Sequence, residues 1–158
     1  MIREVIDANK AFIETVAGIG TVLPFMRITK DGHETKSVFG DVEADKINLV
    51  TIHYKTVTKM EDETTGAIVN PMKLKFSVYQ SFVDSAKYHG STQQKFDTLL
   101  DALIVAYDAE QTYVYNSQRY TIGDVKEFDT DFGDFGVMTF LGKPCHYCEF
   151  EIDSYLEE

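Results

Sequence analysis

The sequence predicts a single α+β domain, in which an antiparallel or mixed β-sheet carries two amphipathic helices packed on one face. Two segments show the three-and-four spacing of apolar residues that is typical of helices. The other apolar segments alternate with polar residues, as half-buried strands do. The length of 158 residues fits one domain, and an apolar content of 44% with 13% aromatic residues is typical of a folded chain.

The first segment is predicted to be an amphipathic surface helix that covers apolar residues. Asn9 occupies the one step of its apolar stripe at which an apolar residue is missing. Gly18 and Gly20 are expected to end the helix, because glycine readily adopts the left-handed conformation that follows helix C-termini. The stripe consists of Ile2, Val5, Ile6, Phe12, Ile13 and Val16.

Two long strands are predicted in the middle of the chain, at residues 47–57 and 74–82. Residues 22–29, which include Pro24, are typical of a short edge strand. The segment between the two long strands, residues 59–71, exceeds an ordinary hairpin connection. We therefore expect a long β-hairpin whose arm protrudes from the domain.

The second helix is predicted at residues 91–107, with Ser91 as its N-cap and Gln94 at the spacing of a capping box. A continuous apolar stripe should bind this helix to the sheet. The stripe consists of Phe96, Leu99, Leu100, Leu103, Ile104 and Tyr107.

The remaining segments are predicted to be strands. Asn116 and Ser117 are typical of a tight hairpin turn. Residues 125–129 and 137–141 are expected to be strands on either side of a glycine-containing turn. In the last strand Cys148, Phe150 and Ile152 alternate with acidic residues, which indicates that one face is buried.

The formal net charge of −11 is distributed unevenly, because residues 124–158 contain ten acidic and only two basic side chains. This region is interpreted either as solvated strand edges and a frayed tail, or as a negative surface that repels DNA or attracts a basic partner. The acidity argues against a protein that coats duplex DNA, because binding to the phosphates requires Lys and Arg. No apolar run has the length of a membrane span, and no signal peptide is recognisable, so a cytosolic chain is expected.

Three patterns in the sequence are candidates for chemical sites. Cys145 and Cys148 form a CxxC, which is half of a zinc site or a redox pair, but no second pair of ligands accompanies it. The run from Asp129 to Asp134 departs from the EF-hand template, because Phe140 stands where the last calcium ligand should be. No nucleophile elbow or phosphate-binding loop is present. We therefore expect no catalytic residue, no cofactor and no metal.

The order of these elements resembles the tail terminator (neck) proteins of long-tailed bacteriophages. The resemblance covers most of the chain: an N-terminal amphipathic helix, two long strands joined by an arm, the segments Lys73-Leu-Lys-Phe-Ser-Val-Tyr-Gln-Ser-Phe82 and Ser91-Thr-Gln-Gln-Lys-Phe-Asp-Thr-Leu-Leu-Asp-Ala-Leu-Ile104, and a terminal run of strands. It lies in topology and carries no short diagnostic motif. The arm at 59–71 and an expected exposed loop at 29–45 depart from the shorter members of the family.

The resemblance implies a non-enzymatic virion protein of the tail or neck, made in the host cytoplasm. Six copies would form a ring that caps the tail tube and joins the tail to the head connector, with DNA only as passing cargo. Partners would be other copies, the tail tube protein, and sheath and head-connector proteins reached by the loop and arm. Under this hypothesis acidic residues line the bore (Asp129, Asp131 and Asp134) and others on the arm make contacts (Glu61, Asp62 and Glu63). The alternatives are another head- or tail-completion adaptor, or a small cytosolic CxxC redox or metal protein.

Overall fold

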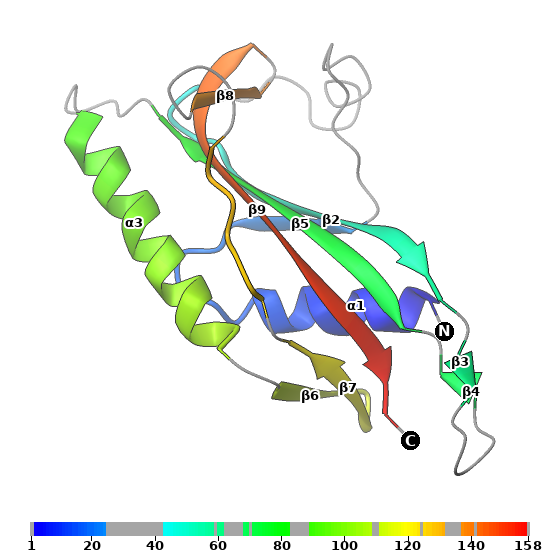
Figure 1. Cartoon of the computed structure of the whole chain (residues 1–158). Coiled ribbons are helices and arrows are strands. Elements are labelled where there is room, and N and C mark those ends of the chain that lie inside the picture. The colour runs from blue at the N-terminus through cyan, green and yellow to red at the C-terminus, as the bar shows by residue number, and fades with distance from the viewer. Residues whose placement is uncertain are drawn as a thin grey trace.

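Two helices pack against a seven-stranded mixed sheet that is curled strongly enough to form a half-barrel (Figure 1). This arrangement, seen in a computed structural model, confirms the α+β class expected from the sequence. The structure describes residues 2–24, 43–58, 60–61, 68–69, 71–82, 89–108, 111–123, 125–131, 137–140 and 142–157. The elements in chain order are α1 (Ile2–Ile13), β1 (Thr21–Pro24), β2 (Asn48–Val57), β3 (Met60–Glu61), β4 (Ile68–Val69), β5 (Met72–Ser81), α3 (His89–Ala106), β6 (Gln111–Tyr115), β7 (Gln118–Ile122), β8 (Val137–Phe140) and β9 (Lys143–Leu156).

The main sheet has the strand order β1-β2-β5-β9-β7-β6, and β8 pairs with β9 outside this path. β1 runs parallel to β2, whereas the other pairs are antiparallel. The centre of the sheet is formed by β2, β5 and β9, and β9 is the longest strand with 14 residues. The predicted antiparallel pairing of the two long middle strands is confirmed, with Val50 opposite Val78.

One face of the sheet buries both helices in a common core. The helices contribute Val5, Ile6, Ile13, Phe96, Leu99 and Leu103, and the central strands contribute Val50, Ile52, Leu74, Phe76, Val78, Cys148, Phe150 and Ile152. Alternate strand residues point to this face, as the period of two requires. Burial of each large apolar side chain contributes about 1.5–3 kcal/mol, so this layer holds the helices in place.

Tyr107 joins the two helices to the sheet within this core. Its ring packs edge-on against Phe12 with centroids 5.0 Å apart, and it also contacts Phe76 and Phe150 at 6.1 and 5.1 Å. Phe76 and Phe150 themselves stack with a centroid distance of 4.8 Å. One aromatic cluster therefore fixes the C-terminal end of α3 and the end of α1 against the central strands.

Two of the predicted hairpins are present, the one with the arm and the one that turns at Asn116 and Ser117. β3 and β4 pair as a short two-stranded extension of the β2–β5 hairpin and point away from the domain (Figure 1). Glu61 lies in β3, while Asp62 and Glu63 fall outside the described residues. In the β6–β7 hairpin the turn residues Asn116 and Ser117 have φ values of 48° and 65°, which is the conformation of a tight two-residue turn.

Several predicted boundaries are wrong in detail. α1 ends at Ile13, although Gly18 takes the left-handed conformation (φ 90°) in the turn that follows. α3 begins at His89, so Ser91 lies in its first turn and is not the N-cap. Ile104, placed in the buried stripe by spacing, is 51% exposed. The edge strand is described only as Thr21–Pro24, and the expected loop at 29–45 lies almost entirely outside the described residues.

Residues 125–129 are not a strand, contrary to the prediction. Phe128 packs on Phe150 with ring centroids 4.8 Å apart, and Val125 also packs against the core. The segment is therefore held by side-chain packing and does not pair with β9 as a strand. Only Asp129 returns to β9, as an isolated bridge to Glu149. β8 forms a hairpin with the start of β9, in which Phe140 is opposite Lys143.

Candidate functional site

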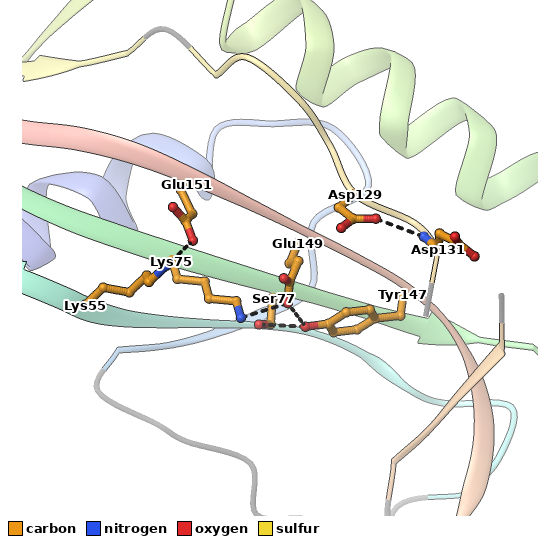
Figure 2. A network of polar contacts seen from close by, with 8 residues as sticks. All are labelled: Lys55, Lys75, Ser77, Asp129, Asp131, Tyr147, Glu149 and Glu151. Atoms are coloured by element: carbon orange, nitrogen blue, oxygen red, sulfur yellow. Dashed lines mark hydrogen bonds and ion pairs between the residues drawn. The ribbon is translucent and has the colours of Figure 1, made fainter. Parts of the chain in front are cut away.

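The face of the sheet opposite the helices carries a network of charged and hydroxyl groups (Figure 2). Alternation along β5 and β9 places Lys75, Ser77, Glu149 and Glu151 on this face, because their neighbours in the sequence are in the core. Lys55 joins them from β2, at a register shift between Tyr54 and Thr56. We refer to this surface as the polar sheet face.

Two ion pairs cross the strands on the polar sheet face. Lys55 Nζ lies 2.7 Å from Glu151 Oε1, and Lys75 Nζ lies 2.9 Å from Glu149 Oε2. The hydrogen bond from Lys55 lowers the pKa of Glu151, and the same contact raises the pKa of Lys55. The pair of Lys55 and Glu151 is therefore held in its charged form, which does not suit these two groups to exchange protons near neutral pH.

Tyr147 connects this charged area to a small apolar cluster on the same face. Its hydroxyl lies 2.7 Å from Glu149 Oε2 and 3.1 Å from Ser77 Oγ. Burial raises the pKa of Tyr147 and that of its neighbour Tyr79, so both phenols stay protonated. The apolar cluster covers one end of the face and consists of Ile47, Leu49, Tyr79, Phe140, Cys145 and Tyr147.

A cavity of about 500 Å³ opens beside β9, where the sheet is interrupted. The pairing of β7 with β9 ends at Ile122 opposite Ser154, and the next contact on that edge is the bridge of Asp129 to Glu149. The lining combines two lysines with five carboxylates. It consists of Lys73, Lys126, Glu127, Asp129, Glu149, Phe150, Glu151, Ile152 and Asp153.

The predicted acidic residues are partly brought together here. The backbone N–H of Asp131 donates to Asp129 Oδ1 at 3.1 Å, and Asp129 exchanges two backbone hydrogen bonds with Glu149, at 2.8 and 2.9 Å. Asp134 lies outside the described residues. The sequence predicted an acidic region at 124–158 but did not single out Glu127, nor did it indicate that the acidic residues of β9 share this cavity with lysines.

The two cysteines of the CxxC do not form a pair. They are three residues apart on β9, so they point to opposite faces of the sheet. Cys145 belongs to the apolar cluster on the polar sheet face, whereas Cys148 is in the core beneath the helices. Burial raises the pKa of each thiol to about 12. This geometry argues against a disulfide, a redox couple or chelation by these two side chains.

His146, between these cysteines, occupies a structural position. Its ring stacks on Phe96 with centroids 5.1 Å apart, and Nε2 lies 3.2 Å from Thr92 Oγ1. Burial lowers the pKa of His146. The imidazole therefore attaches the first half of α3 to β9. Within the described ranges, no three His, Cys, Asp or Glu side chains are grouped so that they could hold a metal ion.

The class that the structure defines is an α+β half-barrel, with two ion pairs on the sheet face opposite its helices. No protein-family model matches the chain, and a search of curated proteins finds no match. Of the helices in the described part of the chain, none is both long enough and apolar enough to cross a membrane.

Proposed function

We propose that this protein is a structural component of a bacteriophage virion, a tail terminator that assembles into a ring on the end of the tail tube. The single observation that carries the proposal is the pair of unlike sheet edges. β1 ends the sheet on one side and β6 ends it on the other, and each has one strand neighbour among the described residues. Unlike edges favour head-to-tail contacts, which close into rings when the rotation between copies permits.

Exposed apolar side chains support a role in assembly. Val105 is 76% exposed, Val114 is 59% exposed and Ile104 is 51% exposed. Ile104 and Val105 are neighbours on α3, and Val114 lies on β6; exposed apolar side chains at a surface are available for protein contacts. A ring of six copies would bury such residues between subunits.

The chemistry of the polar sheet face favours a structural role over the CxxC redox or metal alternative. Glu149 and Glu151 are paired with lysines, and burial keeps the phenols of Tyr79 and Tyr147 protonated. Cys145 and Cys148 lie on opposite faces of the sheet and cannot act together. Another head- or tail-completion adaptor would use the same kind of ring, and it differs from a terminator in whether it binds the end of the tail tube.

The acidic surface at the end of the 125–131 segment suits a bore through which DNA passes. Asp129 and Asp131 are both exposed, and a negative lining prevents adhesion of the phosphate backbone. We propose that these two residues line the bore; Asp134, the third residue of the hypothesis, lies outside the described residues. The arm that begins at β3 and carries Glu61 would contact the tail tube, the sheath or the head connector.

The proposal is tested by measuring the molar mass of the protein by light scattering, alone and after mixing with purified tail tubes. We expect a species several times the 17.9 kDa of the chain, and co-sedimentation with the tubes. A ring that never sediments with tubes would favour another adaptor. A chain that remains a monomer with and without tubes would refute the ring altogether.

A further inference from the structure

The exposed side of α3 carries an apolar centre between carboxylates. Ile104 and Val105 are the exposed apolar residues, at 51% and 76%. Asp101 lies one helical turn before them, and Asp108 follows shortly after the end of α3 at Ala106; both are exposed. Lys95 is the one Lys or Arg in the sequence of this helix. We call this the α3 surface.

The β6–β7 hairpin carries the opposite combination. Val114 and Arg119 are directly opposite each other in the ladder, so their side chains share one side of the hairpin. Tyr113 and Tyr120 occupy the other side and pack toward the core. Val114 is 59% exposed, and Arg119 is exposed and forms no ion pair with another described residue. We call this the hairpin surface.

We propose that the hairpin surface of one copy docks on the α3 surface of the next copy. Val114 would pack on Ile104 and Val105, and the Arg119 guanidinium would lie between the carboxylates of Asp101 and Asp108. Three of the most exposed large apolar side chains in the described residues would then be covered at once. This inference rests on the ring proposed above. It names a contact in which the β6 edge of one copy meets α3 of the next copy, and the β1 edge takes no part in it.

The two surfaces fit a contact between identical chains for a physical reason. They lie on different elements of one molecule: the C-terminal part of α3, and the β6–β7 hairpin that follows it in the chain (Figure 1). Contact between unlike surfaces repeats from copy to copy, as a ring requires. Opposite charges at the edge of an apolar contact also fix its orientation and disfavour pairing of two α3 surfaces, which would bring their carboxylates together.

The contact is tested with single substitutions and a charge exchange, followed by sedimentation equilibrium of the full chain. We expect Val105→Asp, Asp101→Arg and Arg119→Asp each to weaken association by about tenfold or more, which is typical for a truncated or reversed contact residue. The Asp101→Arg/Arg119→Asp double variant should associate at least about tenfold more tightly than either single variant. Val57→Asp is the matched control, because Val57 is 42% exposed but belongs to neither surface.

The outcomes separate this contact from the ring itself. If the unmodified chain forms rings and the three variants form them equally well, the contact is wrong while the ring stands. If the double variant is no tighter than the weaker single variant, the pairing of Asp101 with Arg119 is wrong. A monomeric unmodified chain would overturn both proposals. Circular dichroism of each variant shows that the fold is intact, because all substituted side chains are exposed.

Discussion

Asn9 on α1 holds the N-terminal helix to the sheet through hydrogen bonds, and its removal should destabilise the whole domain. The residue is fully buried. Its Nδ2 donates to Val5 O at 2.8 Å and to Ser154 Oγ at 2.9 Å, and Ser154 Oγ donates in turn to Thr121 O at 2.6 Å. One side chain thus connects α1 with both β9 and β7. The change to test is Asn9→Ala.

The expected cost follows from the atoms that are lost. Two hydrogen bonds contribute about 1 kcal/mol each, and the missing side-chain atoms leave a cavity that costs about 1 kcal/mol. Asn9 Oδ1 is buried without a hydrogen-bond partner in the described structure, so its removal offsets about 1 kcal/mol. The free energy of unfolding should therefore fall by about 2 kcal/mol.

Urea denaturation followed by circular dichroism measures this change. Gln94→Ala is the matched control, because Gln94 is an exposed amide on α3, and it should change the unfolding free energy by less than about 0.5 kcal/mol. Combining Asn9→Ala with Ser154→Ala should reveal a coupling of about 1 kcal/mol, because the two side chains share a hydrogen bond. An Asn9→Ala protein as stable as the unmodified chain would refute the reasoning and would mean that Asn9 only interrupts an apolar stripe.

Three further predictions concern the turn, the imidazole and the thiols. Ser117→Gly should raise the unfolding free energy by about 0.5–1 kcal/mol, because glycine adopts the φ of 65° without strain; unchanged urea midpoints would contradict this. Burial lowers the pKa of His146 below its ordinary value of 6.5, so the unfolded chain binds the proton more readily than the folded chain does. The contribution of His146 to stability is therefore complete above pH 6.5 and is lost as the pH falls below 6.5. His146→Gln should flatten the pH dependence of the melting temperature below pH 6.5. Cys145 and Cys148, with pKa values of about 12, should resist a thiol reagent in the native protein and both react after unfolding, and rapid modification of the native chain would count against the buried arrangement.

Periodicity predicted most of the fold because the buried faces are regular. Val50 and Ile52 on β2, and Phe150 and Ile152 on β9, point to the core as their alternation indicates. The turn at Asn116 and Ser117 was predictable because few residue pairs tolerate two positive φ values.

The misplaced elements are those in which tertiary contacts outweigh local pattern. Residues 125–129 alternate like a strand, but Phe128 packs on Phe150, and this contact keeps the segment from pairing along the edge of β9. Ile104 has the spacing of a core residue, yet the curled sheet reaches only the side of α3 that carries Leu99 and Leu103.

The candidate surfaces were less predictable than the fold, since they depend on which strands become neighbours. The pairing of Lys55 with Glu151 crosses 96 positions of sequence and requires β5 to lie between β2 and β9. The opposite orientation of Cys145 and Cys148 follows from a strand assignment alone, and that signal was available in the sequence. The position of Val114 beside Arg119 follows equally from the tight turn between them.

The central claim, that the protein forms a ring on the end of a tail tube, is tested most directly by electron microscopy of tail tubes incubated with the gold-labelled protein. The account predicts label at one end of each tube and none along its length. Label distributed along the tubes, or tubes with bare ends at saturating protein, would contradict it.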